Sequence, residues 1–265
     1  MGKESKRNWV KSVGRDHKIS FLCLQESKMV VQHEWQVASV WGGNHFKFAS
    51  IDPVGRSSGL LTIWNDSMFQ ALDVEKKDRF IVVVGKWLSS QVDLGVINVY
   101  APHDFQNKKL LWEELLGTIR KAPRLAWVIC GDFNEVRAAE ERKGSNFDPI
   151  GARFFNDFIA SAGLIDIRLG GRKFTWMSRD YSKLSKLDRF LVSAEFVNLL
   201  PMSNALALPR IFSDHCPIIL DSRSIDGGPI PFKFFNSWLS DKDLQEVVEK
   251  SWNMSGPELE VFSKL

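Results

Sequence analysis

Residues 125–134 read LAWVICGDFN, an apolar run that stops at a group of polar residues. The run over residues 125–130 has the length and composition of a buried β-strand, and Gly131 interrupts it. Asp132 and Asn134 occupy alternate positions, so both side chains would lie on one side if the strand continued through them. As ordinary turn formers, they would only end the strand. The segment therefore predicts a core strand that leads into an acid–amide pair.

Helical and strand patterns surround this segment. Leucines at helical spacing predict a helix over residues 106–120, and phenylalanines predict another over residues 151–162. Two more helices are expected, one over residues 3–16 and one that carries Val30, Val31, Trp35 and Val37. Strands are expected over residues 19–24, 46–50, 60–64, 69–74, 80–87, 92–99, 174–177, 186–192 and 217–220. Runs of strands between helices indicate an α+β sandwich of two packed sheets with helices outside.

Composition bounds the class of protein. The chain has 265 residues, 44% hydrophobic and 25% charged, with a formal net charge of +3. Such a charge is compatible with a polyanionic partner but does not demand one. Cys23, Cys130 and Cys216 lie far apart, which favours free buried thiols in a reducing compartment over a thiolate metal site. We expect an intracellular protein with no membrane segment.

The character of the sequence changes near residue 221. Residues 226–231 read DGGPIP, which is typical of a linker, and apolar residues at helical spacing follow it. We therefore expect one large domain over residues 1–221 and a linker with a helical segment over residues 222–265.

Polar residues that could carry chemistry border the predicted strands. Glu26 follows one strand, Tyr100 ends another, Asp214 and His215 precede the last, and Asp188 lies within an apolar strand. Taken alone, Glu26 could be a solvated acid and His215 a structural histidine, whereas an acid such as Asp188 among apolar neighbours must be paired. With the acid–amide pair above, this set suits metal-assisted phosphodiester hydrolysis. Carboxylates bind Mg²⁺, and an Asp–His pair stabilises a charged imidazole.

Several short motifs resemble those of the endonuclease/exonuclease/phosphatase superfamily, in that family's order. They are LQE (24–26), NVYAP (98–102), GDFN (131–134), LDRF (187–190) and SDHCP (213–217). The resemblance implies a four-layer αββα sandwich, with two mixed sheets face to face and helices on both outer faces. The segments FLCLQESKM (21–29), FTW (174–176) and PFKF (231–234) are similar to plant non-LTR retrotransposons of the LINE type. In those polyproteins a reverse transcriptase follows the nuclease.

The resemblance also implies roles for the metal site and the water. Glu26 would bind the metal, Mg²⁺ with Mn²⁺ as the alternative, and Asp214 would support the metal or its water network. Asp132 would position or deprotonate the attacking water, and Asn134 would help to hold water and phosphate.

Other residues would serve the phosphate. His215 would contact the scissile phosphate, Asp188 would orient His215, and Tyr100 would donate a hydrogen bond to the phosphate. His103 stands where apurinic endonucleases of this family often carry Asn. Basic residues near the expected mouth of the site could contact phosphates or could equally form an ordinary solvated face: Arg172, Lys173, Arg179, Lys183 and Lys186.

One departure from the family pattern bears on activity. The family begins with a strand that contributes an active-site Asn, and Met1 here falls at about the start of the following helix. We expect that first strand to be missing by N-terminal truncation, with activity impaired. The predicted function is a nuclear, Mg²⁺-dependent DNA endonuclease of a retrotransposon. The alternatives are a non-catalytic remnant that at most binds nucleic acid, and a phosphoesterase acting on a lipid or inositol phosphate.

Overall fold

The computed structural model describes residues 4–53, 59–221 and 249. The chain divides into two compact units, Met1–Ser224 and Ile225–Leu265, and the fold described below is that of the first. The linker and helical segment expected over residues 222–265 lie outside the described residues, except for Glu249. None of the described helices is long and apolar enough to cross a bilayer.

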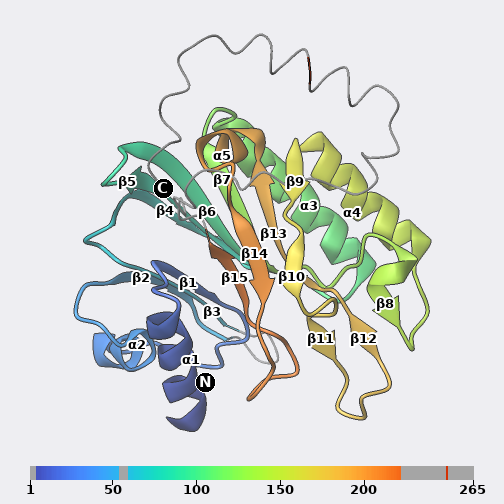
Figure 1. The fold of residues 1–265 in the computed structure, drawn as a ribbon, viewed down its shortest axis with the longest axis horizontal. Coiled ribbons are helices and arrows are strands. Elements are labelled where there is room, and N and C mark those ends of the chain that lie inside the picture. Colours follow the sequence, from blue (N-terminus) through green and yellow to red (C-terminus); the bar gives the residue numbers. More distant parts are fainter. Residues whose placement is uncertain (1–3, 54–58, 222–248, 250–265) are drawn as a thin grey trace. The chain divides into compact units, whose positions relative to one another are not determined.

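A mixed six-stranded sheet forms the centre of the fold (Figure 1). Its strands, in spatial order, are β4 (Phe69–Lys76), β5 (Phe80–Trp87), β6 (Val92–Tyr100), β7 (Ala126–Asp132), β13 (Asp188–Ser193) and β9 (Leu164–Asp166). β6 and β7 run parallel, and their neighbours pair antiparallel. Every residue of β7 is buried, as expected for an apolar strand covered on both faces.

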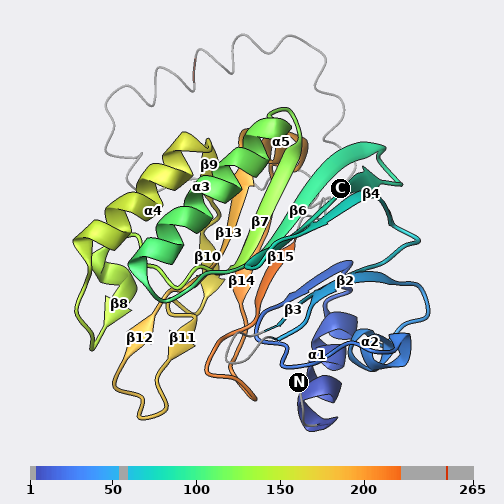
Figure 2. The ribbon, with the colours of Figure 1, turned by 180° about the vertical axis from the view of Figure 1, so that it is seen from behind.

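Two helices cover the outer face of this sheet. α3 (Phe105–Lys121) follows the cap Asp104, and α4 (Pro149–Ser161) follows the cap Asp148; each cap carboxylate accepts a backbone N–H of the first turn. Their apolar stripes pack with the sheet into one core that includes Trp112, Phe133 and Phe155. Figure 2 shows both helices lying along this face. The two helices predicted from leucine and phenylalanine spacing are therefore confirmed.

The other face of the sheet packs against a second layer that consists of two separate three-stranded sheets. One has the order β1 (Phe21–Leu24), β3 (Leu60–Trp64), β2 (Lys47–Ile51), and the other β10 (Leu169–Gly171), β14 (Asn204–Ala207), β15 (Ile218–Asp221). α1 (Glu4–Asp16) and α2 (Glu34–Trp41) pack on the first of these through Val10, Val37 and Val40. The α+β layering with helices outside the sheets is confirmed.

This second layer differs from the single sheet expected. Within the described residues β1 and β15 are each the last strand of their sheet. Residues of both strands line a cavity of about 1210 Å³, together with apolar side chains of α1, β6, β7 and β13. The second layer is therefore divided by this cavity instead of being continuous.

Several smaller elements escape the sequence patterns. They are the strands β8 (Arg142–Lys143) and β12 (Leu184–Ser185), the 3₁₀ turn Ala139–Glu141, the helix α5 (Ala194–Leu199), and β9, β10 and β14. β8 and β12 form a small sheet with β11 (Trp176–Met177), which lies within the strand predicted over residues 174–177. Most are too short for a periodicity to show.

The helix predicted to carry Val30 and Val31 is wrong in its extent. α2 begins only at Glu34, because Gln36 Oε1 accepts the backbone N–H of both Gln32 and His33 and so closes a capping box there. Val30 and Val31 therefore precede the helix.

One buried amide joins the two layers. Asn98 of β6 is fully buried, and its Nδ2 donates to Thr62 Oγ1 at 3.1 Å and to Leu61 O at 3.3 Å, both on β3. Its Oδ1 accepts from Gln25 Nε2 at 2.6 Å. A buried amide whose donors and acceptor are all used fixes the position of one sheet on the other.

Asn98→Leu is therefore expected to lower the free energy of unfolding by about 2 kcal/mol, since it leaves buried partners on β1 and β3 unsatisfied. Urea unfolding followed by tryptophan fluorescence measures the change. Asn146→Ala, at an exposed position, is the control and should stay within about 0.5 kcal/mol of the parent. An Asn98→Leu protein as stable as the control would show that this amide does not hold the layers together.

Candidate active site

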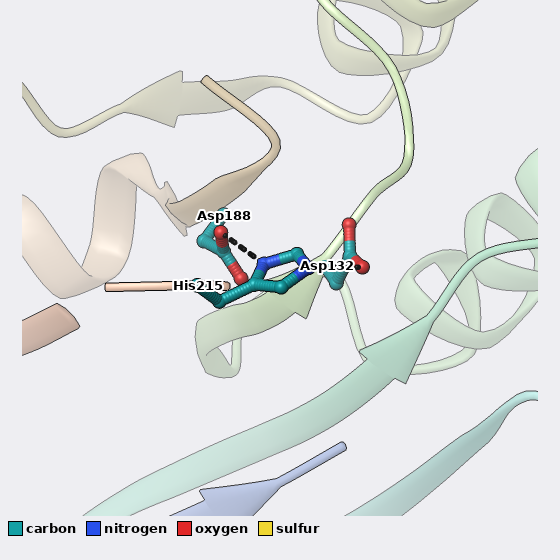
Figure 3. A group of neighbouring side chains, drawn as sticks. All are labelled: Asp132, Asp188 and His215. Carbon is teal, nitrogen blue, oxygen red and sulfur yellow. Dashed lines mark hydrogen bonds and ion pairs between the residues drawn. The ribbon is translucent and has the colours of Figure 1, made fainter. Parts of the chain in front are cut away.

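Two acids of adjacent strands lie directly opposite each other in the central sheet. Asp132 ends β7 and Asp188 begins β13, and the antiparallel register pairs these two residues. Both are buried. His215, in the segment before β15, lies against them (Figure 3): its Nδ1 is 2.9 Å from Asp188 Oδ2 and its Nε2 is 3.8 Å from Asp132 Oδ2. The structure thus brings together three residues selected from the sequence.

Burial and charge set the protonation of this group. Burial, then the neighbouring Asp188 carboxylate, raises the pKa of Asp132 to about 7. Burial disfavours the charged form of His215, but the charges of Asp188, Asp132 and Asp214 and the Asp188 hydrogen bond outweigh it and raise the pKa of the imidazole to about 9. At neutral pH the site therefore contains an imidazolium beside a carboxyl group close to its own midpoint, which suits proton transfer.

Asn134 stands next to this group but does not extend the strand. Its φ of 47° places it in the left-handed region, so β7 stops at Asp132. Its backbone N–H donates to Asp132 Oδ1 at 2.9 Å, and its Nδ2 donates to Ala101 O at 2.7 Å. The turn interpretation is therefore confirmed, and the two side chains do not share a face by strand alternation.

Thr175 is a buried residue that the sequence did not single out as part of the site. Its Oγ1 accepts the backbone N–H groups of Leu187 and Asp188, each at 3.0 Å, and so fixes the start of β13 where the acid stands. The adjacent Trp176 donates from Nε1 to Asp214 Oδ2 at 3.2 Å. The FTW segment over residues 174–176 contains both residues, but from sequence it indicates only a resemblance to plant retrotransposons.

Glu26 and Tyr100 form a second pair in the site. Tyr100 ends β6, and its hydroxyl donates to Glu26 Oε1 at 2.6 Å. Glu26 follows β1 with a φ of 49° and contributes to the raised pKa of Asp132 through its charge. The structure thus gives the Tyr100 hydroxyl a carboxylate partner, and its predicted bond to a phosphate stays a prediction.

The acids of the site suit a hard divalent cation. Ligand atoms of Asp132, Asp188 and His215 all lie within 4.8 Å of one another. His215 is the poorest ligand of that group, because its Nδ1 is engaged by Asp188 and its raised pKa keeps the ring charged. The predicted ligands Glu26 and Asp214 line the same cavity as these three residues. Carboxylate oxygens from Glu26, Asp132 and Asp214 therefore fit Mg²⁺ better than the imidazole does.

The predicted basic residues divide into two groups. Arg172, Lys173, Arg179 and Lys183 are exposed, and Arg179 lines the cavity that contains the acids. Lys186 is partly buried, and its Nζ lies 3.5 Å from Asp166 and 3.6 Å from Glu141 in an ionic network with Arg189. Its ammonium is therefore already paired with acids, and a phosphate contact by Lys186 stays a prediction. His103 is exposed, and its role stays a prediction.

The family model of the endonuclease/exonuclease/phosphatase family matches residues 5–215, which span the whole of this site. The chain belongs to this family. Its members are hydrolases that act on phosphodiesters or phosphate esters, generally with divalent metals. No curated protein sequence matches the chain.

Solved structures of this family share the fold. An AP endonuclease from Leishmania major has a TM-score of 0.65 and 16% identity over 81% of this chain and 82% of its own. The endonuclease domain of TRAS1, a telomere-specific non-LTR retrotransposon, has a TM-score of 0.60 and 14% identity over 83% and 93%. A mannosyl-6-phosphatase from Bacteroides thetaiotaomicron has a TM-score of 0.57 and 12% identity over 82% and 90%. At these identities the likeness establishes the fold.

The Asp188–His215 contact predicts a measurable titration. In EDTA, NMR of the imidazole should give a pKa of about 9 for His215, and Asp188→Asn should move it down toward 6.5, because the main charge partner is removed. Asp180→Asn, in the exposed β11–β12 loop, is the matched control and should leave the His215 titration unchanged. A His215 pKa near 6.5 in the unaltered protein would contradict this electrostatic account.

The buried Asp132 carboxyl predicts a pH-dependent loss of stability in the metal-free protein. The folded group holds its proton up to about pH 7, whereas the unfolded one releases it near 3.8, so the loss develops as pH rises through this window. Asp132→Asn should therefore stabilise the protein by about 2 kcal/mol above pH 7 in EDTA and by little near pH 4. Urea unfolding measures this, with Asp73→Asn as the exposed control. A gain of equal size at both pH values would refute the ionisation argument.

Proposed function

We propose that this chain is a Mg²⁺-dependent DNA endonuclease, the nuclease of a non-LTR retrotransposon of the plant LINE type, acting in the nucleus. The observation that carries the proposal is the charged His215 held between Asp188 and an Asp132 that titrates near neutral pH. The likeness to the TRAS1 endonuclease domain supports the choice of substrate. The motifs similar to plant retrotransposons support the lineage.

The chemistry follows from the placement of these groups. Asp132 accepts a proton from a water molecule whose oxygen attacks the phosphorus. The bond between phosphorus and the leaving oxygen breaks, and that oxygen keeps the electron pair. His215, oriented by Asp188, donates a charged hydrogen bond to a phosphate oxygen as negative charge develops there.

Glu26 and Asp214 would hold the cation, which would supply charge neutralisation at the phosphate. Tyr100 keeps the Glu26 carboxylate in place through their 2.6 Å hydrogen bond. The backbone N–H of Asn134 donates to Asp132 Oδ1 and so restrains that carboxylate. Each acid is thus restrained by a neighbour before substrate arrives, which is the condition for precise positioning.

Exposed basic residues near the site support a nucleic-acid substrate. Arg179 and Lys183 are exposed in the segment between β11 and β12, and Arg172 and Lys173 are exposed just before it. Cations on one peripheral segment beside an acidic centre can neutralise backbone phosphates on either side of the scissile one. Binding by such contacts weakens as salt concentration rises.

The proposal predicts nicking of supercoiled plasmid by the purified chain in Mg²⁺, with none in EDTA. Asp132→Asn and His215→Ala should each lower the rate by about 10²- to 10⁴-fold, because each removes a group that acts on the reacting atoms. His45→Ala, at an exposed position remote in sequence from the motifs, is the matched control and should keep full activity.

Assays of other substrates with the same purified protein distinguish the alternative functions. Release of phosphate from inositol phosphates or phosphatidylinositol phosphates, without nicking, would replace the DNA substrate by a phosphate monoester. Retained binding of a DNA duplex by a folded protein, with no cleavage of any substrate, would mean a non-catalytic nucleic-acid-binding protein. Either result would overturn the proposed endonuclease.

A further inference from the structure

A buried ion pair lies behind the catalytic turn and contributes no atom to the reaction described above. Lys108 of α3 and Glu135, which follows Asn134, are 8% and 4% exposed. Lys108 Nζ is 2.7 Å from Glu135 Oε2 and donates to the backbone carbonyl of Asn134 at 2.6 Å. One ammonium group thus contacts both the turn and the acid that follows it.

Stability alone does not account for this pair. Lys108 stands one turn into α3, near the helix end that disfavours a positive charge. Burying both charges removes their hydration, and such pairs are often matched or surpassed in stability by apolar side chains of similar size. Because this pair contributes little to the free energy of unfolding, we look for its role in the groups that it holds in position.

The Asn134 turn carries an external restraint on its backbone. Its φ of 47° lies in the left-handed region, which Asn adopts more readily than most residues, and the backbone has to keep this conformation for its N–H to reach Asp132. The Nδ2 bond to Ala101 O fixes the side chain. The ammonium group of Lys108 donates a charge-assisted hydrogen bond to the backbone carbonyl of Asn134. This bond sets the orientation of the peptide plane between Asn134 and Glu135.

Glu135 in turn holds the ammonium group in place. Its Oε1 accepts the N–H of Val136 at 3.1 Å, and its Oε2 lies against the first turn of α4. A Cβ on Gly151 would come within 2.7 Å of that Oε2, so the absence of a side chain at this position makes room for the carboxylate. The negative charge lies beside a helix N-terminus, where it is favoured. The ammonium is therefore held between α3, the turn and α4.

We infer that Lys108 and Glu135 are positioning residues: they lock the Asn134 turn and, through its backbone N–H, the carboxylate of Asp132. This inference rests on the proposed hydrolysis at Asp132. The pair acts through the turn and does not itself touch substrate.

The test replaces both charges at once, because a single substitution would leave an unpaired buried charge and could unfold the protein. Lys108→Met/Glu135→Leu should melt within about 4 °C of the parent or above it. Its kcat for plasmid nicking should fall by about 10- to 100-fold with little change in KM, since substrate contacts remain while the water-activating acid loses its position. The surface pair Lys86–Asp93, at 2.9 Å, provides the matched control, and Lys86→Met/Asp93→Leu should change neither quantity.

A second readout does not require activity. The backbone amide of Asn134, which donates to Asp132 Oδ1, should be protected from hydrogen exchange in the parent and should lose that protection in the Lys108→Met/Glu135→Leu protein. Unchanged protection of this amide would overturn the inference, as would activity lost only in proportion to melting temperature. If the parent itself nicks no DNA, the proposed function fails, while the protection of the Asn134 amide still decides whether the pair holds the turn.

Discussion

The hydrogen bond between Asp188 and His215 is the contact on which the rest of the site depends. Asp188 belongs to the central six-stranded sheet, whereas His215 precedes a strand of the second layer, so the bond spans the two layers. It fixes the imidazole so that the other ring nitrogen faces Asp132. Thr175 Oγ1 accepts the backbone N–H of Asp188 and so helps to fix the position of this acid. Without this contact the acids would still be buried in one sheet, but nothing would hold a charged group against them.

The buried carboxyl groups of the candidate site lower the stability of the folded protein. The strand register puts two carboxyl groups opposite each other, and burial removes the water that would otherwise stabilise their charges. The result is an Asp132 that holds its proton to neutral pH, and a His215 whose charge compensates part of the repulsion. A cation at the carboxylates would relieve the remainder, so metal binding and stability are linked in this site.

Much of this arrangement could be predicted from local sequence, because β7 and its neighbouring strands are apolar enough for their burial to be recognised from composition alone. The run over residues 125–130 is apolar enough to require a core position, and the polar residues at its end therefore mark the edge of a buried sheet. The acid in the LDRF segment over residues 187–190 could be recognised as needing a partner for the same reason. These inferences need no tertiary information beyond burial.

Other features depend on contacts that no local pattern encodes. Lys186 is partly buried and paired, because Asp166 and Glu141, both distant in sequence, lie beside it. Asn134 is held in its left-handed conformation by hydrogen bonds to Ala101, which follows β6, and from Lys108 of α3. The start of α2 is set by a single glutamine side chain, which overrides the spacing of Val30 and Val31. Short elements such as α5 and β14 form because neighbouring strands offer them an apolar surface, which is a property of the assembled core.

The site finally depends on how the two layers are joined. Glu26 extends from β1, Asp132 and Asp188 from the central sheet, and His215 from the approach to β15. Asn98 and the Tyr100–Glu26 bond tie β1 and β3 to the central sheet, and the Asp188–His215 bond ties the approach to β15 to it. The cavity lies between β1 and β15, so the second layer is held to the first by these polar contacts and by the apolar clusters on either side of the cavity. Because several of these contacts join the layers at residues of the candidate site, a change in layer packing would change the geometry of that site.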